Sequence, residues 1–291
     1  MKKSDAYALI TVFLWATLAA VTKMLLADIP NFQALSLSGG LAGLFLLLIN
    51  LKSKKLRLLK SFSLKDYLTM AGLGALGLFA YSALYFYGLT QLSSQKACII
   101  NYLWPIMLVV FSSLILKEKM TKMKVVAILC SFVGIVILSA GSFGTGQGNV
   151  LLGMACCAVA AVCYGLYCVW NKRSDYDQNI AMMIGWLVVA LCSGVLGFLT
   201  EQWVIIRPVQ WAGLLWLGVV VNAVAYLLWA LAMQETDNTA KIANFAYMTP
   251  FLSLVVSAIL LKEQITARAF LALIFIIGGV LLQSLSANGK K

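Results

Sequence analysis

Histidine is absent from this sequence, and charged residues are scarce. None of the 291 residues is a histidine, and only 11% are Asp, Glu, Lys or Arg. The commonest proton shuttle and metal ligand is therefore missing, and neither a metal nor a cofactor is expected. The apolar segments also lack a central aspartate and any Ser–His pair, which argues against an intramembrane protease and against an enzyme in general.

Apolar residues dominate what is present. Hydrophobic residues make up 62% of the chain, and the mean hydropathy is +0.94. A soluble core of this size does not need so much apolar surface, so the composition indicates an integral membrane protein. The net charge of +12 is consequently not taken as a sign of nucleic-acid binding. Its distribution along the chain instead reports orientation in the bilayer.

Ten apolar stretches are long enough to cross a bilayer as helices, which predicts an all-α integral membrane protein. They cover residues 6–26, 33–50, 66–88, 95–116, 123–140, 149–171, 179–200, 210–233, 240–261 and 267–285.

The basic residues predict which side of the membrane holds the termini. With ten spans both termini share a side, and seventeen of the 22 Lys and Arg residues then lie on it. Because basic residues concentrate in cytoplasmic loops, both termini are expected in the cytoplasm. The basic runs at 52–60 and 117–124 would also lie well against anionic lipid.

A polar and aromatic motif interrupts the fourth stretch. Asn101-Tyr102-Leu103-Trp104-Pro105 stands within apolar sequence, and a proline there frees a backbone carbonyl that protein or a water-lined cavity must satisfy. A shift of 145 residues places Ala246-Tyr247-Met248-Thr249-Pro250 under it, with Tyr and Pro matched. Pro105 and Pro250 are therefore predicted to act as gating hinges.

The same offset relates much more of the chain. Tyr81 meets Tyr226 and Lys96 meets Lys241, while Trp15 meets Tyr164 at an offset of 149. The pattern predicts two five-helix repeats, 1–145 and 146–291. Since five is odd, the second repeat is inverted relative to the first, as in transporters that give alternating access to a site near the midplane.

Helical spacing brings aromatic and amide side chains together in several stretches. Rings with a polar handle suit a flat or apolar substrate that carries amine and carboxylate groups. The predicted cavity wall consists of Tyr81, Tyr85, Asn101, Trp104, Tyr164, Asn222, Tyr226, Trp229, Asn244 and Tyr247.

These motifs, together with Leu14-Trp15-Ala16-Thr17, resemble the aromatic amino acid exporters of the drug/metabolite transporter superfamily, whose EamA-type architecture covers essentially the whole chain. The resemblance implies a ten-helix carrier in the bacterial inner membrane, with a cavity between its halves and Trp15 among its substrate contacts. The chain departs from that pattern at Lys96, where those exporters tend to have an acidic residue, and at Lys241.

Three readings of the function follow. The preferred one is export of amino acids, aromatic or bulky and apolar, by a monomer or homodimer. The second is a carrier for an anionic metabolite that binds Lys96 and Lys241, although the interpretation we favour for both lysines is that they extend to the lipid headgroups. The third is a membrane scaffold or receptor subunit that transports nothing.

Overall fold

The computed structural model describes residues 3–115, 148–174, 176–234, 245–246 and 248–288, with isolated positions between 117 and 137. The described part is helical and contains no strand. Its first helices are α1 (Lys3–Ala16), α2 (Leu18–Leu26), α3 (Asn31–Lys52), η1 (Lys55–Ser61), α4 (Leu64–Leu73), η2 (Gly74–Ala80), α5 (Tyr81–Gln91), α6 (Ser94–Asn101) and α7 (Trp104–Ile115). The later helices are α9 (Val150–Lys172), α10 (Gln178–Thr200), α11 (Pro208–Leu215), η3 (Trp216–Ala225), α12 (Tyr226–Gln234), α14 (Thr249–Leu261) and α15 (Ala267–Asn288).

The described residues contain seven helical segments that are long and apolar enough to cross a membrane, and two shorter apolar helices. An all-α membrane protein is thus confirmed. The seven agree with predicted stretches, and the shorter pair, Thr249–Leu261 and Ala267–Gly279, falls in the last two. Of the predicted stretch 123–140 the structure describes only isolated positions, so the count of ten stays a prediction.

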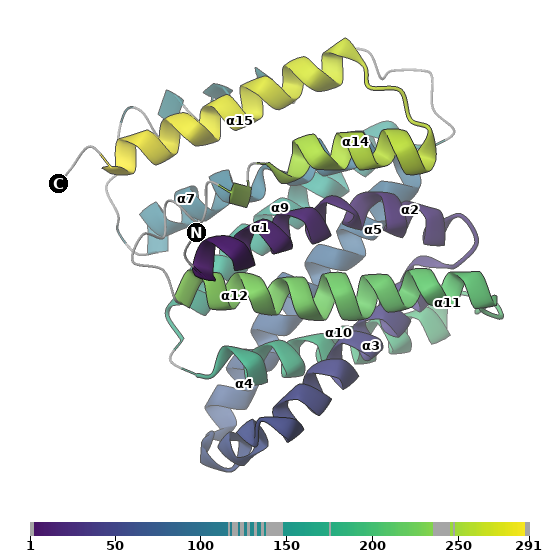
Figure 1. Ribbon diagram of the computed structural model, residues 1–291, viewed down its shortest axis with the longest axis vertical. Helices are drawn as coiled ribbons and strands as arrows, with labels where there is room; N and C mark the ends of the chain where they lie inside the picture. The colour runs from purple at the N-terminus through teal and green to yellow at the C-terminus, as the bar shows by residue number, and fades with distance from the viewer. Residues whose placement is uncertain are drawn as a thin grey trace.

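The helices form one bundle in which they run roughly side by side (Figure 1). The first residue of α1 and the last turns of α15 lie at the same end, which we call the terminal end. The opposite end, which we call the far end, holds the connection from α2 to α3 and the starts of α11 and α15.

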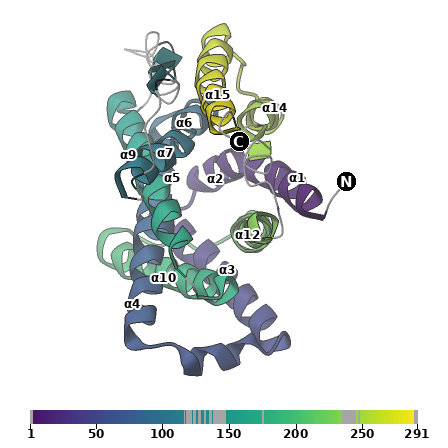
Figure 2. The same ribbon diagram turned by 90° about the vertical axis from the view of Figure 1, so that its left-hand side faces the viewer.

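Close packing of α3 against α10 forms the lower part of the bundle (Figure 2). Glycines make this approach possible: a Cβ on Gly39 would stand 3.0 Å from the Val189 side chain, and one on Gly74 of η2 would stand 2.7 Å from the Gly185 Cα. Since lipid gives no hydrophobic drive between helices, small residues at the contact allow the van der Waals packing that holds them together.

Two carboxylates at the far end cap the N-termini of distant helices. Glu201, just after α10, accepts the backbone N–H groups of Phe32 and Gln33 at 2.9 and 3.1 Å. Glu263, after α14, accepts those of Ser94 and Gln95 at 2.8 and 3.1 Å. A carboxylate at this place satisfies donors that have no partner within the helix and complements the helix dipole. Both carboxylates therefore join parts of the chain that are distant in the sequence.

At the terminal end, polar contacts join the start of α10 to the end of α3 and the start of η1. Lys55 Nζ lies 2.8 Å from Asp177 Oδ2, and Asn50 Nδ2 donates to the Asn179 carbonyl at 3.2 Å. Partial burial acts to raise the pKa of the Asp177 carboxyl, but hydrogen bonds from Lys55, Asn179 and the Ile180 N–H outweigh it and leave the pKa below its usual value. Asp177 therefore stays ionised at neutral pH.

Candidate functional site

The Asn-Tyr-Leu-Trp-Pro motif breaks its helix. α6 ends at Asn101, α7 begins at Trp104, and Tyr102 and Leu103 form the turn between them. Pro105 is the second residue of α7, a position where a missing N–H costs little. Pro250 is likewise the second residue of α14. Each motif thus starts a new helix inside an apolar stretch.

The two motifs are joined by the hydrogen bond that proline chemistry requires. Pro250 has no N–H to offer the Ala246 carbonyl four residues earlier. The Tyr102 hydroxyl donates to that carbonyl at 2.7 Å. A carbonyl freed by the second motif is therefore satisfied by a side chain of the first, which fixes the two breaks against each other.

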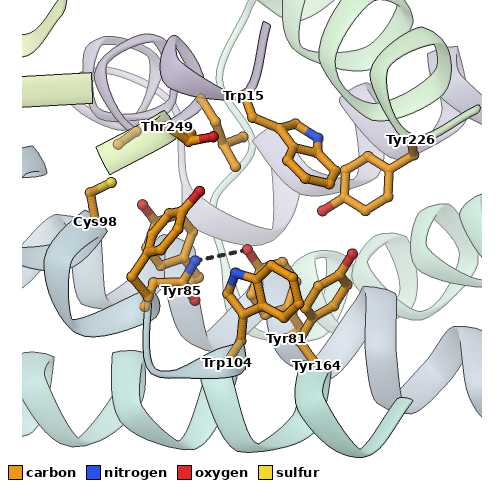
Figure 3. Close-up of a pocket in the computed structure, with 12 residues that line it drawn as sticks. Trp15, Tyr81, Tyr85, Cys98, Trp104, Tyr164, Tyr226 and Thr249 are labelled. Atoms are coloured by element: carbon orange, nitrogen blue, oxygen red, sulfur yellow. Dashed lines mark hydrogen bonds between the residues drawn. The ribbon is translucent and has the colours of Figure 1, made fainter. Parts of the chain in front are cut away.

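A cavity lies beside these breaks (Figure 3). It has a volume of about 40 Å³ open to the centre of a water molecule, which is room for a few waters. None of the described residues around it has a side chain that is charged at neutral pH. Its lining consists of Trp15, Leu18, Ala19, Tyr81, Tyr85, Cys98, Asn101, Tyr102, Trp104, Tyr164, Tyr226 and Thr249.

The aromatic rings of the lining pack on one another. Tyr164 of α9 is central: its ring centroid lies 4.9 Å from that of Tyr81, 5.2 Å from Trp104 and 6.4 Å from Tyr226. Trp15 of α1 meets Tyr226 edge to face at 5.2 Å. Edge-to-face and tilted pairs are favourable arrangements for such rings, so the wall is a continuous aromatic surface built from five helices.

Polar atoms accompany this aromatic surface, among them the hydroxyls of its tyrosines and the side chains of Asn101 and Thr249. Asn101 Nδ2 donates to the Tyr81 hydroxyl at 3.0 Å, drawn as the dashed line in Figure 3. Asn101 Oδ1, Trp15 Nε1 and Thr249 Oγ1 are buried and have no hydrogen-bond partner among the described residues. A buried polar group without a partner is costly, so a hydrogen bond to any of these three atoms would be favourable.

A π-helical segment precedes each of the tyrosines at positions 81 and 226. η2 ends at Ala80 and η3 at Ala225, so Tyr81 and Tyr226 begin the α-helices that follow. Such segments insert an extra residue per turn and are frequent at functional sites. Gly77 of η2 lies against the Tyr167 ring so closely that a Cβ would overlap it. The π-helical turn and the glycine together bring α5 onto α9.

Seven of the predicted site residues line this cavity: Trp15, Tyr81, Tyr85, Asn101, Trp104, Tyr164 and Tyr226. Trp229 stands behind them, 5.1 Å from Trp15 between ring centroids, and Asn222 is buried within η3; neither is part of the lining. Lys96, in the first turn of α6, does not line the cavity either. Asn244, Tyr247 and Lys241 lie outside the described residues.

Sequence reasoning missed four contributors. Thr249 lies 3% exposed in the lining, and its position matches Trp104 at the offset of 145. Cys98 lies one helical turn before Asn101, and Tyr102 was noted only as part of the motif. Trp186 of α10, 1% exposed, supports the wall from behind with its ring 5.6 Å from that of Tyr226. The repeat offset alone could have identified Thr249; no pattern singles out Trp186.

Comparison with known proteins gives a consistent result. Residues 2–140 and 151–285 match a model of the EamA-like transporter family. The uncharacterized transporter YoaV of Bacillus subtilis (strain 168) is 27% identical over 96% of this chain and 95% of its own length. The aromatic amino acid exporter YddG of Ancylobacter novellus is 26% identical over 73% of this chain and 74% of its own. A crystal structure that is 23% identical has the same fold, with a TM-score of 0.72 over 98% of this chain and 97% of its own.

Proposed function

We propose that this chain, which belongs to the EamA-like transporter family, exports amino acids with aromatic or other bulky apolar side chains through the aromatic cavity. The observation that carries this proposal is the convergence of rings from α1, α5, α7, α9 and α12 on one space with an uncharged lining. Such a surface suits an apolar side chain, and its few polar atoms suit the amine and carboxylate. The 26% identity to an aromatic amino acid exporter supports the substrate class.

The proposal includes two inverted repeats, residues 1–145 and 146–291, that meet at the cavity. Three pairs related by the repeat offsets contribute to its lining: Trp15 with Tyr164, Tyr81 with Tyr226, and Trp104 with Thr249. Each π-helical segment also precedes the tyrosine of its own repeat. The separate matches of the family model to 2–140 and 151–285 support the same division.

Alternating access follows from this arrangement. A volume of about 40 Å³ holds a few waters but no amino acid, so the cavity must widen to bind substrate. Exchange of the repeats' roles would open it to one face and then to the other. We place the carrier in the bacterial inner membrane with cytoplasmic termini, because basic residues favour that side. Whether it works as a monomer or homodimer stays a prediction.

Substitutions in the cavity are expected to separate this function from anion transport. Asn101→Ala removes the hydrogen bond to the Tyr81 hydroxyl and the proposed partner of a substrate amine, and Trp104→Ala removes a stacking face. Each should weaken amino acid binding by about 1–3 kcal/mol. Binding and exchange in proteoliposomes of the purified protein measure this.

Lys96→Ala is the matched comparison, because Lys96 is on α6 with Asn101 but outside the lining. It should leave amino acid affinity nearly unchanged. If Lys96→Ala is the variant that loses binding, and small organic acids compete where aromatic amino acids do not, the carrier takes anions through Lys96 and Lys241. An absence of flux for every solute would favour a scaffold or receptor.

The prolines are expected to control turnover. Alanine at 105 or 250 supplies an N–H that can bond to the carbonyl four residues earlier, so the helix can continue across the break. Pro105→Ala and Pro250→Ala should therefore slow exchange more than they weaken binding. Paired measurements of substrate affinity and exchange rate test this, and a loss confined to affinity would contradict a gating role.

A further inference from the structure

Three residues that line the aromatic cavity each carry a buried polar atom with no hydrogen-bond partner among the described residues. The atoms are Trp15 Nε1, Asn101 Oδ1 and Thr249 Oγ1, which we call the polar triad, and they belong to α1, α6 and α14. The described residues include eight buried side-chain atoms of this kind, and three of them belong to the lining of this one cavity. Their three helices are far apart in the sequence.

The polar triad is buried, so its unmade hydrogen bonds affect which ligand is bound. Asn101 is 6% exposed and Thr249 3% exposed. The Asn101 amide is held through its other atom, since Nδ2 donates to the Tyr81 hydroxyl, so Oδ1 has a fixed direction. A water or a ligand atom that meets these groups regains the hydrogen bonds that folding removed. A ligand that fits all three is favoured over one that fits none.

The hydrogen-bonding types of the three atoms differ. An indole N–H can only donate, an amide oxygen can only accept, and a hydroxyl can do both. Trp15 and Thr249 approach the cavity from one side, and Tyr81, Trp104 and Tyr164 approach it from the other (Figure 3). Trp15 Nε1 and Thr249 Oγ1 can both donate to a carboxylate. Asn101 is hydrogen-bonded to Tyr81, and its amide oxygen can accept from an ammonium group. These are the two ends of an α-amino acid.

The rest of the lining disfavours ligands that carry a net charge. A molecule with net charge would enter a buried space whose described lining has no counter-ion, at a high desolvation cost. A zwitterion also loses the hydration of both charged ends, but its net charge is zero and the polar triad can hydrogen-bond each end. We propose that the polar triad determines specificity for the α-amino acid backbone, with Trp15 and Thr249 on the carboxylate and Asn101 on the ammonium; this rests on the proposed function. The aromatic wall then selects only the side chain.

Three indoles of one ring system separate these contacts: L-tryptophan, tryptamine without the carboxylate, and indole-3-propionate without the ammonium. The two analogues carry net charge and should bind more weakly than tryptophan, so each variant is compared with the wild-type protein for the same indole. Trp15→Phe keeps a ring and removes the donor, and Thr249→Val keeps the shape and removes the hydroxyl. Each should lower tryptophan affinity about tenfold and leave tryptamine affinity at its wild-type value. Asn101→Leu should lower affinity for tryptophan and tryptamine but not for indole-3-propionate. Inhibition of labelled tryptophan binding to the purified, full-length protein measures all three.

Two controls make the result specific. Thr249→Ser should restore the tryptophan affinity that Thr249→Val loses. Thr22→Val removes another buried and unpartnered hydroxyl, on α2 and outside the lining, and should leave binding unchanged. Thermal unfolding in detergent verifies that each variant is folded.

The outcomes distinguish the polar-triad proposal from the proposed function on which it rests. If wild-type protein binds tryptophan and Trp15→Phe and Thr249→Val bind it equally well, the polar triad is wrong and the proposed function stands. An equal loss for tryptophan and tryptamine overturns the carboxylate assignment. If the wild-type protein binds none of the three indoles, both proposals fail.

Discussion

Glu263→Ala is expected to destabilise the protein by about 2–4 kcal/mol, because two backbone N–H groups of α6 lose the carboxylate that accepts them. Water cannot readily replace it, since Ser94 is fully buried and Gln95 is 3% exposed. The loss also separates α6 from the end of α14. Thermal unfolding in detergent, followed by tryptophan fluorescence, should show a clearly lower midpoint.

Two further carboxylates test whether a helix cap contributes more to stability when the carboxylate comes from a distant part of the sequence. Glu201→Ala removes the equivalent cap from α3 and should lower the midpoint in the same way. Asp66 also caps a helix, but it does so locally: it forms an exposed capping box with Ser63, the residue just before its own helix α4. Asp66→Ala should therefore cost only about 1 kcal/mol. If all three substitutions have the same small effect, the caps are local features that do not hold the bundle together.

Gly77→Ala is expected to disrupt the contact between η2 and α9. The added methyl would overlap the Cβ and ring of Tyr167, and Cβ cannot rotate away because it is fixed to the α9 backbone. Overpacking of this kind typically costs about 1–3 kcal/mol. Tyr167 stacks on Tyr164 at 5.8 Å, so its displacement reaches the cavity. Both the unfolding midpoint and amino acid binding should fall.

Gly72 supplies the matched control on the same continuous helix. A Cβ there meets nothing within 4 Å, and the residue is exposed. Gly72→Ala should be neutral or stabilise the helix by up to about 1 kcal/mol, since alanine loses less backbone entropy than glycine. Equal midpoints for the two alanine variants would mean that η2 has room to move away from α9.

The sequence was most informative where apolar length and side-chain spacing determine the structure. Seven predicted stretches correspond to long apolar helices, and seven predicted site residues line one cavity. Tyr81 and Tyr85, four residues apart, were expected on one face and are stacked at 6.0 Å. Helical periodicity suffices for such predictions because it is a local property.

Features that depend on packing between helices were not predictable in this way. The π-helical turns before Tyr81 and Tyr226 lie where η2 and η3 pack against neighbouring helices, and no residue pattern predicts them. Proline predicted an unsatisfied carbonyl, but its partner, the Tyr102 hydroxyl, comes from 144 residues away. The caps from Glu201 and Glu263 are also contacts between distant parts of the sequence. Their positions in the sequence alone indicate only carboxylates in loops.

Under the proposed function, the uncharged lining of the cavity also determines how the carrier responds to voltage. Moving one elementary charge across a bilayer changes the free energy by about 2.3 kcal/mol per 100 mV. The described lining holds no charge at neutral pH, and the proposed zwitterionic substrate adds none, so neither the loaded nor the empty cavity would move net charge in the proposed alternating access. Both half-cycles are then electrically silent. An energised membrane would neither drive export nor oppose it, and net flow would follow the concentrations of amino acid on the two sides.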